Sequence, residues 1–314
     1  MKLAFAVFFS ALLIGCSQPP WPNPPAADPT QYQAEYDAWR QDRQNAITHA
    51  VQLIGLWPLP EGDTPFGADA ALPIVLKGQG VPAKAGIFRR TGTKVMVAPV
   101  PGSPLALENG GTITAPLELK SVMDPSPTVL AVGSLRLQIE QVFEKFGARR
   151  WVTAWDEDHP IVKSPPVVEA YPPDQRWRVA ARFDAFATPR SIRVSDVLGG
   201  FMDLTAAGEL VFHLNGQEQR LTAITFDGSD DFFVMFKDDT NRSTTYAGYR
   251  TLFARGVEHK GWTVLDFNLA ANPPCAYSTF TTCPLPPPEN QLAVAIEADE
   301  KRYPSAQGFA PAGP

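Results

Sequence analysis

The fold class of this chain is decided by the stretch Glu209-Leu210-Val211-Phe212-His213-Leu214-Asn215-Gly216-Gln217-Glu218-Gln219-Arg220-Leu221-Thr222-Ala223-Ile224. Runs rich in apolar and β-branched residues flank the dipeptide Asn215-Gly216 on both sides. Asn-Gly between two such runs is the strongest short signal of a β-hairpin, because a tight hairpin turn needs positive φ at both central positions. This stretch therefore predicts two antiparallel strands joined by a two-residue turn.

Short apolar runs of the same kind recur from Leu53 onward, separated by Gly, Pro, Asn and Asp. Regularly spaced short strands with turn signals between them are typical of sandwiches and barrels. We therefore predict a mostly β protein with one N-terminal helix. The predicted order is a β-sandwich over 53–146, a linker over 147–175 and a second β-sandwich or barrel over 176–303, followed by a flexible tail over 304–314.

The one predicted helix covers 30–52. Asp28 can cap its first turn and Pro29 is favoured at an early helical position. Apolar and aromatic side chains recur at helical spacing along one face. They are Tyr32, Tyr36, Trp39, Ile47 and Val51. We interpret this face as a packing surface.

The first residues have the pattern of a secretory signal, with Lys2 followed by an uncharged apolar run. The run is too short to span a membrane comfortably, and its end, Leu13-Ile14-Gly15-Cys16, resembles the lipobox of bacterial lipoproteins. That resemblance implies a signal peptide over 1–15 and acylation of Cys16, and Ser17 favours the periplasmic face of the outer membrane. The alternative is an ordinary signal peptide with a chance cysteine. The proline-rich segment 16–29 predicts a semi-rigid spacer.

Composition limits the possible partners. The chain has 314 residues, a formal net charge of −6 and 44% hydrophobic residues, so it can bury a large core and has no basic excess for nucleic acid. Besides Cys16 it has two cysteines, Cys275 and Cys283. An even pair in an exported protein predicts a disulfide, worth about 2–3 kcal/mol in the chain-entropy model. A metal pair is the alternative, and no nearby histidine supports it.

The rhythm of the N-terminal strands resembles that of the forkhead-associated sandwich. The segments that carry this resemblance are Phe66-Gly67-Ala68, Ile74-Val75-Leu76, Asn109-Gly110-Gly111-Thr112-Ile113 and Gly133-Ser134-Leu135-Arg136-Leu137. Phosphothreonine-binding members of that family need Arg where Ala68 stands, so the resemblance implies the fold and argues against phosphopeptide binding.

The C-terminal third resembles a bacterial family of unknown function numbered 1684. The blocks that carry the resemblance occur in order: Phe236-Lys237-Asp238-Asp239-Thr240, Thr245-Tyr246-Ala247-Gly248-Tyr249-Arg250, Leu265-Asp266-Phe267-Asn268, Asn272-Pro273-Pro274-Cys275-Ala276-Tyr277 and Cys283-Pro284-Leu285-Pro286-Pro287-Pro288-Glu289-Asn290. The family usually continues with Ala-Gly-Glu, where this chain has Ala298-Asp299-Glu300. The resemblance implies no established activity.

Candidate site residues come from these blocks. Asp266 and Asn268 are two apart, so on a strand they share a face and could bind a hydroxylated or amine ligand. Asp239, Tyr246, Arg250 and Asn272 could join them from neighbouring segments. The alternative is structural: Asp266 pairs with Arg250, and the two asparagines cap the backbone of the proline-rich loop.

Two functions remain open at this point. The first is an envelope-bound binding or accessory module, held at the membrane by its lipid, whose partner is a small molecule or an envelope protein. The second is an extracytoplasmic hydrolase with a polar site around Asp266. The sequence has none of the metal-binding, nucleophile-elbow or nucleotide-binding motifs, so we predict no cofactor and no metal, and whether the protein is an enzyme is undecided.

Overall fold

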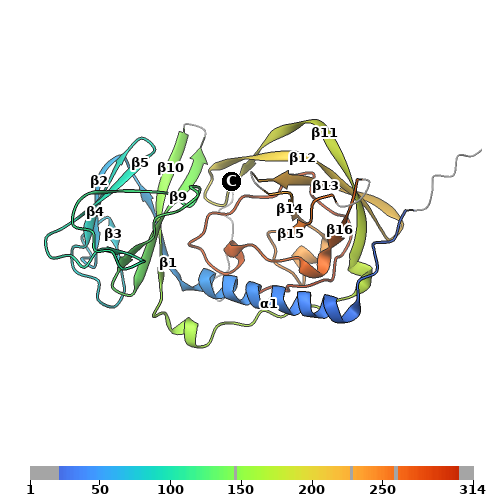
Figure 1. Ribbon diagram of the computed structural model, residues 1–314, viewed down its shortest axis with the longest axis horizontal. Coiled ribbons are helices and arrows are strands. Elements are labelled where there is room, and N and C mark those ends of the chain that lie inside the picture. The colour runs from blue at the N-terminus through green and yellow to red at the C-terminus, as the bar shows by residue number, and fades with distance from the viewer. Residues whose placement is uncertain (1–20, 145–146, 227–228, 258–260, 304–314) are drawn as a thin grey trace, which may run out of the picture.

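The computed structural model describes residues 21–144, 147–226, 229–257 and 261–303. The predicted signal peptide 1–15, the predicted lipidation site Cys16 and the predicted tail 304–314 lie outside the described residues. Figure 1 shows two β-rich bodies side by side, with a long helix running along the larger, C-terminal one. The predicted fold class, mostly β with one N-terminal helix, is confirmed. No helix among the described residues is both long and apolar enough to cross a membrane.

The helix is α1 (Pro29–Gln52), and it begins where the sequence predicts. The side chain of Asp28 accepts a hydrogen bond of 2.9 Å from the backbone N–H of Gln31, so a helical donor that would otherwise lack a partner is satisfied. Tyr36, Ile47 and Ala50 are buried. The C-terminal half of the helix therefore packs on the body through the predicted apolar face.

The N-terminal body is a sandwich of two β layers. Its strands are β1 (Leu53–Leu59), β2 (Gly62–Gly67), β3 (Ile74–Val75), β4 (Gly86–Thr91), β5 (Lys94–Pro99), β6 (Ala106–Leu107), β7 (Leu117–Leu119), β8 (Leu130–Val132), β9 (Leu135–Glu144) and β10 (Gly147–Asp156). One layer has the order β3-β2-β4-β5-β7, and the other is formed by β1, β10, β9, β8 and β6. Side chains from both layers share one buried core, which includes Phe66, Phe88 and Leu137.

The C-terminal body is a curled half-barrel. Its strands are β11 (Arg178–Ser195), β12 (Phe201–Leu214), β13 (Gln217–Thr225), β14 (Phe232–Phe236), β15 (Arg250–Ala254) and β16 (Trp262–Asp266). They pair antiparallel in the order β16-β11-β12-β13-β14-β15, and a contact between β12 and β9 joins this sheet to the N-terminal body. Short 3-10 helices lie between the strands: η1 (Pro160–Lys163), η2 (Gln175–Trp177), η3 (Asp239–Arg242), η4 (Phe267–Leu269) and η5 (Pro274–Ala276).

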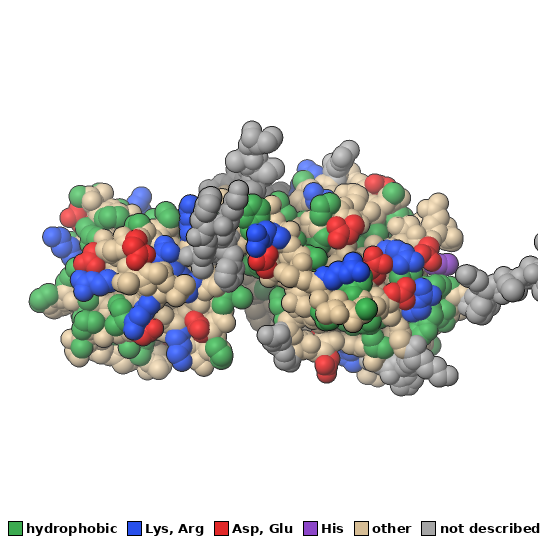
Figure 2. All heavy atoms as spheres, turned by 90° about the horizontal axis from the view of Figure 1, so that it is seen from above, with side chains coloured by type: hydrophobic (Ala, Val, Ile, Leu, Met, Phe, Trp, Pro, Cys, Tyr) green, Lys and Arg blue, Asp and Glu red, His purple; other side chains and the backbone are tan. Residues whose placement is uncertain are grey.

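The predicted hairpin is confirmed as the β12–β13 turn. Leu214 pairs with Gln217 across it, and Asn215 and Gly216 have φ of 52° and 76°. Both central residues therefore adopt the positive φ that such a turn requires. On the outer face of β11, β12 and β13, arginines form ion pairs with neighbouring carboxylates, such as Arg193–Asp203 and Arg220–Glu209. Figure 2 shows basic and acidic side chains interspersed over the upper surface of the molecule.

The prediction of a disulfide is wrong. Cys275 and Cys283 are both free and buried, and they belong to an apolar cluster with Val194, Leu204 and Met235. A hydrogen bond to Cys283, and then burial, raise the pKa of the Cys275 thiol. The two cysteines behave as small apolar side chains with weakly polar S–H groups. An even number of cysteines in a chain with a predicted export signal does not distinguish this role from a disulfide.

The described part of the proline-rich segment, residues 21–28, lies against the half-barrel. The Trp21 indole N–H donates a hydrogen bond of 3.0 Å to the carbonyl of Ala180. Its ring stacks on His213 at a centroid distance of 4.2 Å and meets Trp262 edge-on at 4.8 Å. A tryptophan anchor thus holds this segment on the body, although its prolines prevent it from adding a strand.

Candidate functional site

A cavity lies between the N-terminal half of α1 and the outer face of the half-barrel. Its volume is about 270 Å³. The lining residues that carry charge, hydroxyl groups or an exposed ring are Tyr32, Glu35 and Tyr36 from the helix and Arg178, Phe253, Arg255, Thr263 and Asp266 from the barrel. Strand alternation explains their direction, because Leu265 points into the barrel core and its neighbour Asp266 therefore points outward.

Asp266 is the centre of the polar lining. Its carboxylate accepts hydrogen bonds from Arg178 Nε at 3.1 Å and from the backbone and side-chain nitrogens of Asn268 at 3.1 and 2.9 Å. Arg178 faces Asp266 because the two are directly opposite on β11 and β16. Burial raises the pKa of Asp266, and hydrogen bonds and the Arg178 charge oppose this shift. Burial and the pairing with Arg178 therefore act on the pKa of Asp266 in opposite directions.

Two tyrosines of α1 bring hydroxyl groups to the same cavity. The Tyr32 hydroxyl is buried beside the Asp266 carboxylate without a hydrogen bond of good geometry. Its pKa is raised, first by burial and then by the negative charge of Asp266. Burial also raises the pKa of Tyr36 to about 12. Both groups therefore remain protonated and keep a hydrogen-bond donor.

Two further residues give the cavity unpaired charges of opposite sign. Glu35 and Arg255 are exposed, and neither forms an ion pair with any residue that the structure describes. Glu35 accepts only a hydrogen bond from Gln31, at 2.9 Å. Because Arg178 and Asp266 neutralise each other, the charges left for a ligand are one carboxylate and one guanidinium.

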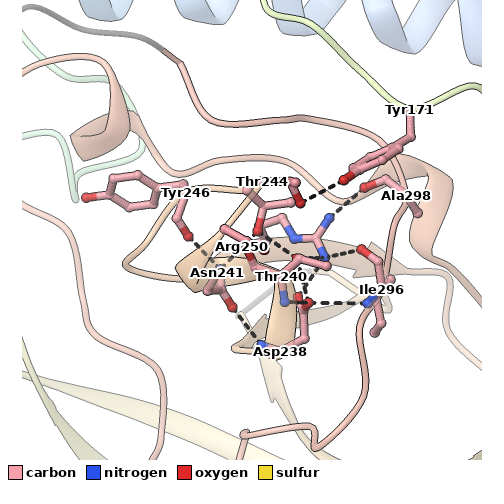
Figure 3. Close-up of polar contacts among 11 residues, drawn as sticks. Tyr171, Asp238, Thr240, Asn241, Thr244, Tyr246, Arg250, Ile296 and Ala298 are labelled. Atoms are coloured by element: carbon pink, nitrogen blue, oxygen red, sulfur yellow. Dashed lines mark hydrogen bonds and ion pairs between the residues drawn. The ribbon is translucent and has the colours of Figure 1, made fainter.

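Arg250 lies in a different, fully buried network. It pairs with Asp238 at 2.6 Å, and both side chains have no exposed area. Its guanidinium also donates hydrogen bonds to the carbonyls of Ala298 and Ile296, at 2.5 and 2.8 Å, and to the Thr240 hydroxyl at 3.5 Å. Figure 3 shows that the loop carrying these two carbonyls comes close to the strands β14 and β15 here. The network holds the loop that contains Ile296 and Ala298, the C-terminal loop, against the barrel. The charges of Arg250 and Asp238 are paired with each other.

Asn272 belongs to a third cluster, which fastens α1 to the body. The buried carboxylate of Glu300 accepts hydrogen bonds from the backbone N–H of Asn272 at 2.6 Å, the Tyr277 hydroxyl at 2.7 Å and Arg43 Nε at 2.9 Å. The adjacent Asp299 contacts Arg40 at 3.4 Å. These contacts connect the helix with the last described segment of the chain.

The predicted site residues are therefore divided among separate places. Only Asp266 lines the cavity, and Asn268 supports it from behind, since its amide also contacts the backbone of Asp174. Arg250 and Asn272 are in the two buried networks. Tyr246 is half-buried, its ring directed away from the Arg250 side chain, and Asp239 is exposed. The proposed pairing of Arg250 with Asp266 does not occur, because β-sheet register gives Asp266 a different arginine.

The residues that complete the cavity were not identified as site residues from the sequence. Tyr32 and Tyr36 were interpreted as a packing face, since the i, i+4 spacing of aromatic residues is the same for either role. Arg178 and Arg255 stand in ordinary strand contexts, so no local pattern marks them. Only the register of β11, β15 and β16 brings them beside Asp266.

Among the described residues no group of three or more His, Cys, Asp or Glu side chains could hold a metal ion. The polar cluster proposed for a hydrolase, which combines Asp266 and Asn268 with Tyr246 and Arg250, does not converge on one cavity. A hydrolase would have to use Asp266 with the residues that accompany it in the cavity.

Comparison with known proteins agrees with the resemblance of the C-terminal third. The family described as protein of unknown function DUF1684 matches residues 166–301. A solution NMR structure of an uncharacterized protein of Haloarcula marismortui is 31% identical, over 45% of this chain and 78% of that one, with a TM-score of 0.38. No curated protein matches the chain. The match to the DUF1684 family of unknown function spans residues 166–301, which include every barrel strand and Asp266.

Proposed function

We propose that this protein is a cell-envelope lipoprotein whose DUF1684 domain binds a small zwitterionic ligand in the cavity beneath α1. One observation carries the proposal: the cavity has a carboxylate and a guanidinium, Glu35 and Arg255, that no described residue pairs. A ligand with an anionic and a cationic group would satisfy both.

The other lining residues suit the same ligand. The Tyr32 and Tyr36 hydroxyls are donors that stay protonated, and the Arg178–Asp266 pair gives a neutral polar wall. A volume of about 270 Å³ lies just below the usual range for drug-sized ligands. We therefore expect a head group or metabolite of modest size.

The location of the protein in the cell envelope is part of the proposal and rests on the sequence alone. Lys2, the apolar run that follows it and Leu13-Ile14-Gly15-Cys16 support export and lipidation, and Ser17 supports the outer membrane. A lipid anchor would place the binding domain where envelope lipids and metabolites are available.

The test is a calorimetric titration of the soluble body, residues 17–314, with glycerophosphoethanolamine, with its purely anionic analogue glycerophosphate, with its purely cationic analogue ethanolamine, and with neutral glycerol. We expect the zwitterion to bind at least tenfold more tightly than either analogue. Arg255→Gln and Glu35→Gln should each remove most of this advantage. Arg193→Gln, which removes an exposed arginine outside the cavity, is the matched control. Equal affinity for charged and neutral probes, or no binding, would contradict the proposal.

A second candidate, an extracytoplasmic hydrolase, is favoured by the position of Asp266 in the cavity lining, where burial raises the pKa of its carboxyl and so makes it a better proton acceptor for acid–base catalysis. Asp266→Asn distinguishes the two functions. It preserves the shape of the site, so a binding protein should keep part of its affinity. Turnover of an ester or phosphodiester that disappears in Asp266→Asn would establish the enzyme.

A further inference from the structure

Three phenylalanines form a strip on the outer face of the half-barrel, next to the cavity. Phe253 lines the cavity and is 61% exposed. Its ring centroid lies 5.0 Å from that of Phe233, which in turn lies 5.7 Å from that of Phe226. Phe226 is 46% exposed. These three rings, the aromatic strip, therefore continue from the mouth of the cavity across β15, β14 and the end of β13.

Strand alternation places the strip outside the barrel core, on the face where Phe233 packs against the apolar cluster that contains Met235. Phe232, Val234 and Phe236 of β14 point into the barrel and are buried there. Phe233 has the opposite direction, and sheet register pairs it with Phe253. Leu252 and Ala254 of β15 likewise point inward. The barrel core is thus complete without Phe226 and Phe253, and their exposure has no role in folding the barrel.

The strip and the cavity are continuous through β15. Phe253 and Arg255 are two residues apart and both line the cavity, as expected for side chains on one face of an extended segment. A ligand that pairs its anionic group with Arg255 therefore meets an aromatic surface directly beside that group. Exposed apolar area at a polar site is typical of surfaces that bind an apolar partner.

We propose that the ligand is a single-chain amphiphile, with a zwitterionic head in the cavity and an acyl chain along the aromatic strip. A lysophospholipid with an amine head group has this chemistry. The inference rests on the proposed function, because it takes the zwitterionic head from there. The aromatic strip adds a surface for an acyl chain, and a free metabolite has no such chain.

The experiment compares glycerophosphoethanolamine with lysophosphatidylethanolamines of increasing acyl length, each below its micelle concentration, by titration into the mature body. Affinity should rise by about twofold for each added methylene. This corresponds to half of the free energy gained by a fully buried methylene, because the strip covers only one side of the acyl chain. The rise should stop once the chain has passed Phe226.

Variants separate the strip from the cavity. Phe226→Ser should lower the ratio of lipid affinity to head-group affinity by at least fivefold. Met123→Ser removes a comparably exposed apolar residue from the N-terminal body, where Met123 is 60% exposed, and should leave that ratio unchanged. Circular dichroism checks that both variants fold.

The possible results of these titrations distinguish the aromatic strip from the zwitterion site. If the head group binds but the acyl chain adds no affinity, or if Phe226→Ser leaves the lipid affinity unchanged, the aromatic strip does not bind the acyl chain. The proposed function would still stand. No binding of head group or lipid would overturn both. Lipid binding that depends on Phe226 without measurable head-group binding would support the strip and contradict the zwitterion site. A dimer in sedimentation that Phe226→Ser dissociates, with no change in lipid affinity, would assign the strip to self-association.

Discussion

At the scale of single residues, Asp299 shows a conflict between side chain and backbone. Its φ is 50°, in the left-handed region that favours glycine. The Asp299 carboxylate is fully buried, and one of its oxygens has no hydrogen bond. Burial, and then the charge of Glu300, raise its pKa well above the usual value.

We predict that Asp299→Gly stabilises the protein by about 1 kcal/mol at neutral pH. The variant relieves a strained φ and removes a poorly paired buried group, and it loses the contact of 3.4 Å with Arg40. Urea unfolding measures the difference. Asn215→Gly, which changes another residue with positive φ in an exposed turn, is the control for backbone strain alone. Destabilisation by Asp299→Gly would show that the Arg40 contact outweighs the strain.

A second residue-scale prediction concerns Glu140 on β9, whose pKa burial raises from 4.5 to about 7. The folded state binds the proton more tightly than the unfolded state, so the stability that Glu140 contributes is present below pH 4.5 and is lost as pH rises to 7. Glu140→Gln should therefore be more stable than the parent at pH 8, by up to about 3 kcal/mol.

Below pH 4 the Glu140→Gln variant and the parent should have nearly equal stability, because Glu140 is then protonated in both states. Unfolding free energies measured from pH 4 to pH 8 provide the test. Glu118→Gln on β7 is the matched control, since the Glu118 side chain is 55% exposed. A parallel pH dependence of the parent and Glu140→Gln would contradict the prediction.

At the scale of elements, the Asp238–Arg250 pair decides how the C-terminal loop is fixed to β14 and β15. Arg250→Ala leaves the carboxylate of Asp238 buried without its partner and deprives the carbonyls of Ile296 and Ala298 of a donor. We predict a loss of about 3–5 kcal/mol. The double variant Asp238→Leu, Arg250→Met should recover part of this loss, because it leaves no unpaired charge.

Chemical denaturation of Asp238→Leu, of Arg250→Met and of the double variant gives the coupling energy of the pair. The exposed Arg193–Asp203 pair is the control and should couple by less than about 1 kcal/mol. If the double variant loses as much stability as the sum of the two single variants, the two residues act independently and the network does not form a unit.

At the scale of the whole molecule, the proposed lipid anchor and the docked segment 21–28 would together determine how the body is held at a membrane. Only four residues lie between Cys16 and Trp21, and Trp21 is bound to the half-barrel. A lipid on Cys16 would therefore hold the half-barrel, and not the N-terminal sandwich, next to the membrane surface. This arrangement would bring the cavity, which Pro25 also lines, close to envelope lipids.

We predict that Cys16→Ser abolishes labelling with palmitate, because the proposed anchor rests on one acylated residue. Metabolic labelling of cells measures this. Cys283→Ser should retain the label, since Cys283 is buried in the folded body. Palmitate labelling that persists in Cys16→Ser would contradict the lipid anchor.

Local features of the fold were predictable because short-range chemistry determines them. Asp28 and Pro29 begin a helix wherever an amphipathic run follows them, and Asn215-Gly216 makes a hairpin turn from its own φ preferences. Alternating apolar residues likewise specify strands and the face that each strand buries. The sequence by itself thus determined the mostly β class, the helix over 30–52 and the resemblance of residues 166–301 to a family of unknown function.

The tertiary structure alone decided which polar groups meet. Asp266 faces Arg178 and not Arg250 because antiparallel register sets β11 against β16, and register depends on pairings between residues far apart in the chain. Cys275 and Cys283 remain thiols within an apolar cluster, which their spacing does not indicate. The cavity forms only where α1 crosses the outer face of the barrel, so its unpaired charges and the aromatic strip beside it are properties of packing, which no local sequence pattern encodes.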